Sequence, residues 1–320
     1  MNMMLPRYDQ LPLRPDGTRT AWPCFGPDDN VGLIGQQTPE SIIEASRLVR
    51  RGAVFPLNAE LRMIEPPLFG RASAKHTIVR FDGDPGFDDV ISAFNPQASS
   101  QWDALAHASC GPNLFFNGAT VADVLERGRN TIDHWARRGI VGRGVLLDIE
   151  PVLAGGVDDY RPDMPIAISV DQLEACRSKA GVDFRPGDIL MVHTGFLNWY
   201  LRQEQARRSA MAATDGLTAA GLEHSESMVR YLWDSHVAAV VSDNPAVEVW
   251  PPDPLESGDP FRSLHPILIG LLGMAIGELW WLADLVADCR MDGVSTMLVT
   301  SAPLHVTGGI SSPPNALAIK

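Results

Sequence analysis

The densest group of side chains that could perform chemistry lies in the segment QASSQWDALAHAS, residues 97–109. Asp103 and His107 are four residues apart, so on a helix or tight turn their side chains would point the same way. Gln101 precedes Asp103 by two residues. Carboxylate, amide oxygen and imidazole are all competent ligands for a divalent metal ion. A helix start, with Asp103 as its cap and His107 as a surface or core histidine, is an equally good interpretation. A nucleophilic pair of His107 and Cys110 is a less favoured one.

Two further ionisable residues, His265 and Glu278, bracket an almost wholly apolar stretch in the segment SLHPILIGLLGMAIGELWWLADL, residues 263–285. An unpaired buried carboxylate is costly, so such a group persists when it is paired or bound to a metal ion. These two residues are therefore a second candidate for a metal site. The alternative is that Glu278 begins an exposed helix face and that His265 lies in a loop.

The remaining candidates are more dispersed. The sequence Ser-Asp-Asn around Asp243 follows an apolar run, and loops at strand ends are where α/β proteins place ligands. Asp-Asn-Pro is also strong turn chemistry, and a turn is the favoured interpretation of Asp243. His76 precedes a strand-like segment and could face a cleft. Four tryptophans could form an aromatic wall or belong to the core: Trp102, Trp250, Trp280 and Trp281.

The segments that must position these residues predict an α/β fold. Short apolar runs bounded by Gly, Pro and Asp are typical of buried strands and occur at residues 144–149, 188–195 and 236–243. Further strands are predicted at 53–61, within 64–100, and at 297–306, where the last is expected to close the sheet. Helices are predicted over 38–51, 121–138, 170–180 and 221–234, the first with Thr38 as its cap and Pro39 at its first position.

Composition and local motifs exclude several classes of protein. The chain has 320 residues and a formal net charge of −13, which argues against a broad surface for nucleic acids or anionic membranes. The longest apolar run, residues 266–277, is shorter than the roughly 20 residues of a membrane span, so it predicts a core segment. The motifs of P-loop NTPases, Rossmann dehydrogenases, zincins and α/β-hydrolases are missing from the sequence. No secretion signal is visible at the N-terminus, and we expect a cytoplasmic protein.

The domain organisation is expected to be simple. Residues 1–35 are rich in Pro, Gly and Asp and predict an extended N-terminal arm. Residues 36–320 show no break in composition and predict one α/β domain.

The candidate segments around Asp103, around Asp243, and from His265 to Glu278 resemble, in this chain order, the cyclase-like metal-dependent hydrolase superfamily. That superfamily includes bacterial kynurenine formamidase and isatin hydrolase. That superfamily carries a motif of the form HxGTHxDxPxH. In residues 97–107, Asp103 and His107 match the motif in register, and Ser100 stands in place of its Thr. Gln97 and Gln101 replace its two leading histidines. Further resemblance is found at residues 142–149, 186–196, 216–248, 264–282 and the C-terminal segment.

The resemblance implies a fold, a site and a reaction. The fold is a mixed sheet forming a small barrel-like core with surrounding helices, assembled as a homodimer or homotetramer with exchanged N-terminal arms. The implied metal ligands are Gln101, Asp103, His265 and Glu278. With two imidazoles replaced, this oxygen-rich set suits one divalent ion, Mn²⁺ or Zn²⁺, with Mg²⁺ as a third candidate.

The implied reaction is hydrolysis of the C–N bond of a small amide, lactam or imide, with His107 as general acid and base. We expect four side chains to line the substrate pocket: Trp102, His76, Asp243 and Trp280. Two alternatives stay open, namely a metal-dependent cyclase or lyase on the same site, and a non-catalytic binding protein that has lost the metal. Nucleic acids and membranes are not expected partners.

Overall fold

Three parallel strands form the centre of the sheet at the positions where the apolar runs predict them. They are β5 (Ile140–Asp148), β7 (Ile189–His193) and β9 (Ala239–Ser242). Every residue of β7 and β9 is buried, because helices cover both faces of a parallel sheet. The computed structural model describes residues 5–83 and 85–320.

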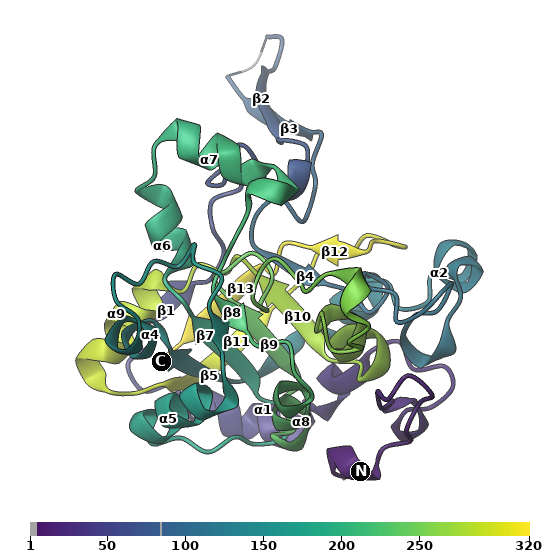
Figure 1. Ribbon diagram of the computed structural model, residues 1–320. Helices are drawn as coiled ribbons and strands as arrows, with labels where there is room; N and C mark the ends of the chain where they lie inside the picture. The colour runs from purple at the N-terminus through teal and green to yellow at the C-terminus, as the bar shows by residue number, and fades with distance from the viewer. Residues whose placement is uncertain (1–4, 84) are drawn as a thin grey trace.

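Six more strands complete a nine-stranded mixed sheet in the order β1-β13-β11-β5-β7-β9-β10-β4-β12 (Figure 1). They are β1 (Val54–Pro56), β4 (Gln101–Asp103), β10 (Ala275–Glu278), β11 (Thr296–Ser301), β12 (Ser311–Ser312) and β13 (Ala316–Ile319). The strand predicted at 297–306 exists as β11, but it does not close the sheet. It lies between β13 and β5, because the C-terminal residues return as β13 and pair along its other side.

Helices pack around the sheet at each place where one is predicted, but several of the observed helices are shorter than predicted or are not predicted at all. They are α1 (Pro39–Ser46), α2 (Val121–Arg127), α3 (Asp133–Arg138), α4 (Glu150–Gly156), α5 (Val170–Ala180), α6 (Phe196–Leu201), α7 (Gln205–Ala212), α8 (Glu226–Asp234) and α9 (Ala283–Asp292). Thr38 caps α1 as predicted, by accepting a hydrogen bond from the Ser41 amide, although α1 ends at Ser46. The helix predicted over 121–138 is two helices, because Gly128 adopts a left-handed conformation that ends α2.

Two other predicted segments change type along their length. The segment 221–234 begins as the short strand β8 (Gly221–Leu222), which pairs with β6 (Ala167–Ile168), and becomes helical only at α8. The apolar run 266–277 lies in the core as predicted. It forms a π-helix (Pro266–Leu271) followed by β10, so it delivers His265 at one end and Glu278 at the other.

The N-terminal segment lies against the body of the same chain. Tyr8, Leu11 and Ile34 are buried in the main core, and the Trp22 indole donates to the Gly270 carbonyl. Residues 5–35 therefore pack on their own chain, and nothing in this packing requires an exchange with a second subunit. Residues 1–4 of the predicted arm lie outside the described residues. Association into dimers or tetramers stays a prediction.

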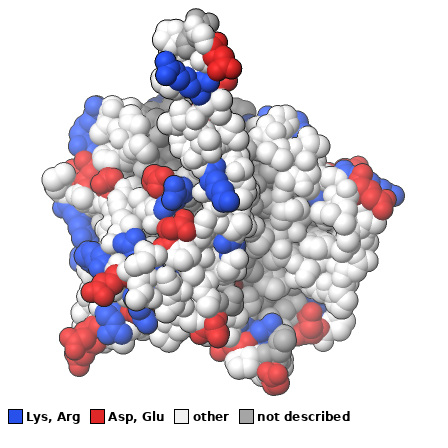
Figure 2. Space-filling model, turned by 90° about the horizontal axis from the view of Figure 1, so that it is seen from above, with Lys and Arg blue, Asp and Glu red and all other residues white. Residues whose placement is uncertain are grey.

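A hairpin projects from the body between β1 and β4. Its strands, β2 (Lys75–Arg80) and β3 (Phe87–Ser92), pair with each other and with no other strand of the described residues, and all their residues are exposed (Figure 1). Basic and acidic side chains lie side by side on the face seen in Figure 2 and are not gathered by sign. Among the helices of the described residues, none is long and apolar enough to span a bilayer.

Candidate metal centre and active site

The candidate metal centre is built on the antiparallel pairing of β4 with β10. In this register Gln101 lies opposite Glu278, and Asp103 lies opposite Ile276. Because side chains alternate along a strand, Gln101, Asp103 and Glu278 point to one face while Trp102 points to the other. On a helix or tight turn Asp103 and His107 would point the same way, but Asp103 lies on a strand and His107 lies beyond its end. The strand brings Gln101 and Asp103 to the same face, because side chains on a strand alternate with a period of two.

Three side chains from distant segments converge at this point. Asp103, His265 and Glu278 can each offer a ligand atom, and these atoms lie within 4.8 Å of one another. His265 Nε2 lies 3.0 Å from Glu278 Oε1, and the Gln101 amide donates to Glu278 Oε2. Asp103 and Glu278 are almost fully buried. The contacts of Gln101, Asp103, His265 and Glu278 with one another bring the four predicted ligands together.

The electrostatics of the site fit a bound cation. Burial raises the pKa of the Glu278 carboxyl, and the nearby Asp103 charge raises it further. Among the described residues, Asp103 Oδ2 and Gln101 Oε1 are buried oxygens with no hydrogen-bond partner. Buried oxygens are rarely left without a partner, and hard divalent cations are bound by such oxygens. The residues present therefore fit the divalent ion that the resemblance implies.

Glu248, for which the sequence predicts no role, orients His265 by binding the ring nitrogen that faces away from Glu278. Its carboxylate binds His265 Nδ1 and the Leu264 amide, and it accepts a bond of 3.0 Å from the Ser263 hydroxyl. His224 Nε2 lies 3.0 Å from its second oxygen. Burial works to raise the pKa of Glu248, but the His265 charge and these bonds lower it to about 2. A carboxylate on Nδ1 leaves Nε2 as the atom available to a metal ion.

Replacing Glu248 by Gln is expected to weaken Mn²⁺ binding by about 10- to 100-fold, because the neutral amide makes His265 a weaker ligand. It should also lower stability by about 1–3 kcal/mol, since an amide cannot accept at both oxygen positions. Titration calorimetry and melting in chelator measure the two effects. Glu256→Gln, at an exposed position, is the control. If Glu248→Gln bound Mn²⁺ as tightly as wild type and Glu256→Gln do, Glu248 would not orient His265 as a ligand.

His107 lies in the turn after β4 and faces the centre from its side. One Gln97 amide nitrogen donates to Asp103 Oδ1 at 3.0 Å and to His107 Nδ1 at 2.9 Å. The Asp103 carboxylate can only accept, so it requires the amide nitrogen on this side. The amide nitrogen in turn makes Nδ1 an acceptor, so the neutral ring carries its proton on Nε2. Gln97, which replaces a histidine of the family motif, thus sets the tautomer of His107.

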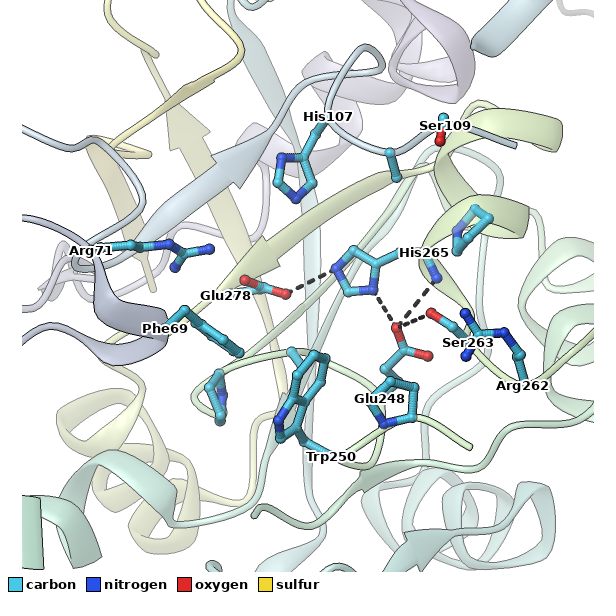
Figure 3. Close-up of a pocket in the computed structure, with 15 residues that line it drawn as sticks. Phe69, Arg71, His107, Ser109, Glu248, Trp250, Arg262, Ser263, His265 and Glu278 are labelled. Carbon is cyan, nitrogen blue, oxygen red and sulfur yellow. Dashed lines mark hydrogen bonds and ion pairs between the residues drawn. The ribbon is translucent and has the colours of Figure 1, made fainter. Parts of the chain in front are cut away.

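These groups open into a cavity of about 490 Å³ (Figure 3). Besides His107, Glu248, His265 and Glu278, its wall includes Phe69, Arg71, Trp250, Arg262 and Ser263. Phe69 and Trp250 meet edge to face, with ring centroids 5.1 Å apart. Phe69 has a φ of +61°, a backbone conformation that costs a non-glycine residue about 1–3 kcal/mol and that is common at ligand sites.

The four residues predicted to line the pocket do not line this cavity. Trp102 and Trp280 lie in the core, where they contact each other and the Trp280 indole donates to the Gln101 carbonyl, so they support the site strands from behind. Asp243 is held by the backbone and hydroxyl of Thr194 in a turn, as the favoured interpretation has it. His76 lies on the projecting hairpin, where it pairs with Asp89.

A second acidic group lies at the carboxyl ends of β5 and β7, outside this cavity. It comprises Asp148, Glu150 and His193. Arg290 binds both carboxylates, and His193 Nδ1 lies 2.8 Å from Asp148. Burial opposes both shifts, yet the pKa of Asp148 is lowered by His193 and Arg290, and that of His193 is raised by Asp243 and Asp148. The group is therefore already neutralised and stabilises the sheet.

Replacing Asp148 by Asn is expected to lower stability by about 2 kcal/mol, the worth of a charge-assisted hydrogen bond. The Asp148 contribution is present above the ordinary pKa of 3.8 and is lost as the pH falls through its lowered value. The His193 contribution is present below 6.5 and is lost as the pH rises through its raised value. Melting curves should therefore differ most between these two values. A difference in melting temperature between wild type and Asp148→Asn that does not change with pH would contradict this role of Asp148. So would an equal difference in the control Asp82→Asn, which changes an exposed residue.

The fold and the site together define a cyclase-type α/β domain with a candidate metal centre at the β4–β10 pair. The chain belongs to the Cyclase family, whose family model matches residues 24–249. It is similar to a solved structure described as a novel cyclase, with 28% identity, a TM-score of 0.81, and coverage of 94% of this chain and 99% of the other. The predicted superfamily is thereby confirmed.

Two isatin hydrolases share the fold at lower identity. Isatin hydrolase A from Labrenzia aggregata has 17% identity and a TM-score of 0.59, with 86% of this chain and 94% of that chain covered. The enzyme from Ralstonia solanacearum has 18% identity and a TM-score of 0.58, with 84% and 92% covered. A search of curated proteins found no match.

Proposed function

We propose that the protein is a metal-dependent hydrolase that cleaves a carbon–nitrogen bond at the carbonyl of a small amide, lactam or imide. One observation carries the proposal: Asp103, His265 and Glu278 converge around unpartnered buried oxygens, next to an imidazole on the wall of a cavity. The family and the shared fold of the isatin hydrolases support the same class of reaction.

Asp103, His265 and Glu278 would hold one divalent ion, with Gln101 Oε1 as a further oxygen donor. The ion would polarise the scissile carbonyl and lower the pKa of the attacking water. An oxygen-rich set of this kind favours Mn²⁺ or Mg²⁺, while Zn²⁺ is also compatible with one imidazole and two carboxylates.

His107 would move the protons. Hydrolysis adds hydroxide to the carbonyl carbon and a proton to the leaving nitrogen, so a group beside the bond must pass a proton between the reactants. Because Gln97 occupies Nδ1, Nε2 is the ring atom that can reach the reactants, and in the neutral ring it already carries a proton. It would give this proton to the leaving nitrogen and take one from the attacking water at the same atom, so that the ring ends unchanged. The cavity wall holds the ring 6.2 Å, between centroids, from the His265 ring. His107 is not a member of the group whose ligand atoms lie within 4.8 Å of one another, which supports a role beside the ion for this ring.

A substrate panel on chelator-treated protein tests the proposal. It would comprise formanilide, N-formylanthranilate, isatin and a simple lactam, each with and without added Mn²⁺. We expect turnover of at least one compound that depends on the ion. A protein that binds the ion but cleaves none of these compounds would support the alternative of a binding protein.

A further inference from the structure

We propose that Arg71 binds an anionic group of the substrate, and that the substrate is an aryl amide with a carboxylate beside its scissile bond. This inference rests on the proposed function and names the substrate class of the same site. The aryl ring would lie on the aromatic surface formed by Phe69 and Trp250.

The Arg71 guanidinium is fixed in the cavity with most of its donors unused. Its Nη1 donates to the Gln97 carbonyl at 2.5 Å, and its central carbon lies 4.8 Å from the centroid of the Phe69 ring. Among the described residues, no carboxylate lies within ion-pair distance of it. Figure 3 shows the guanidinium pointing into the space in front of Glu278 and His107. A planar fork held in this way suits the two oxygens of a carboxylate.

Burial raises the pKa of Glu278 and the Arg71 charge works to lower it, but the two side chains form no direct ion pair. One of the Glu278 oxygens faces His265 Nε2 and the other accepts from Gln101, so the partners of Glu278 are already present. The protein as a whole has a net charge of −13, which disfavours anions near it. An anionic substrate therefore needs a local cation in the cavity, and Arg71 supplies one.

The neighbouring wall selects a flat apolar group. Phe69 precedes Arg71 by two residues, and its ring meets Trp250 at an interplanar angle of 84°. The left-handed backbone of Phe69 turns this ring to the cavity wall, where it lies beside Trp250. Aromatic surfaces of this kind bind planar rings by stacking and edge contacts.

Gln97 connects the proposed anion site to the candidate catalytic residue. Arg71 contacts the Gln97 carbonyl, and the side chain of the same Gln97 contacts both Asp103 and His107. Gln97 thus contacts both Arg71, which would bind the anion, and His107, which would carry the proton. An aryl amide with a carboxylate on the carbon next to the one that bears the amide nitrogen, such as N-formylanthranilate, carries the anion and the scissile bond side by side. Formanilide is the same amide without the carboxylate.

The test compares these two compounds in wild type, Arg71→Met and Arg71→Lys, with the exposed Arg62→Met as the control. We expect Arg71→Met to lower kcat/KM for N-formylanthranilate at least about tenfold more than for formanilide, because both compounds experience the lost bond to Gln97 and only the first loses a partner for its carboxylate. Arg71→Lys should fall between, because it keeps the charge without the fork. An equal loss on both compounds, or a selective loss in Arg262→Met instead, would overturn the assignment.

Binding of anthranilate, measured by calorimetry, needs no turnover and separates this inference from the proposed function. Wild type should bind it at least about tenfold more tightly than Arg71→Met, even if neither formyl compound is cleaved. Equal binding by both proteins would reject the anion site whatever the activity. Binding lost in Arg71→Met without any hydrolysis would keep the anion site and reject the hydrolase.

Discussion

Replacing Asp103 by Asn is expected to lower turnover by about a thousandfold or more and to abolish the rise in melting temperature that Mn²⁺ gives the wild-type protein. Asp103 is fully buried on β4. Among the described residues it is the one carboxylate that joins Glu278 in the candidate metal group with His265. Loss of one ligand from a set with a single imidazole removes the ion, and with it several kcal/mol of carbonyl polarisation. Steady-state kinetics and thermal melts with and without Mn²⁺ measure the two effects.

Melting in chelator provides the control for folding. The pKa of Glu278 is raised by burial and then by the Asp103 charge, so the two carboxylates repel each other without a cation. The change to Asn removes one of these charges and keeps an oxygen that can accept from the Gln97 amide. Asp103→Asn should therefore melt in chelator at the wild-type temperature or above it. A variant that melts much lower, or that keeps its response to Mn²⁺, would argue against the metal centre.

Replacing His107 by Gln is expected to lower kcat by about 10²- to 10⁴-fold, the usual contribution of a general acid or base. The effect of Mn²⁺ on the melting temperature should stay close to that of wild type, because His107 lies beside the proposed ligands and is not one of them. The two variants thus separate proton transfer from ion binding.

The matched control for His107→Gln is His76→Gln. His76 was also predicted from the sequence as a site residue, but the structure places it on the exposed hairpin beside Asp89. Activity in His76→Gln should equal that of wild type. A loss of ion binding in His107→Gln would show that this histidine is a ligand and would revise its role.

The sequence predicts the centre of the sheet and the members of the candidate site, since both leave local signals. β5, β7 and β9 are apolar runs between turn residues. Asp103 and His107 belong to a recognisable motif. The strand β4 leaves no such signal, because it has only three residues and gains its conformation from pairing with β10 and β12. Once β4 is a strand, alternation sends Trp102 into the core and away from the pocket.

The residues missed from the sequence depend on long-range contacts. Glu248 is one carboxylate in a buried loop, and its role appears only when His265 is placed against it. An acid inside the apolar segment AVEVW was the available signal. Phe69 and Arg71 reach the cavity through a turn with a positive φ at Phe69, which no residue pattern in that segment indicates.

Titration of the chelator-treated protein with Mn²⁺, followed by both calorimetry and hydrolysis of the most reactive panel compound, measures ion binding and turnover on the same sample. We expect about one ion per chain, turnover that rises in proportion to occupancy, and loss of both in Asp103→Asn. Turnover that survives removal of the ion, or ion binding that Asp103→Asn retains in full, would contradict the proposed role of this metal centre.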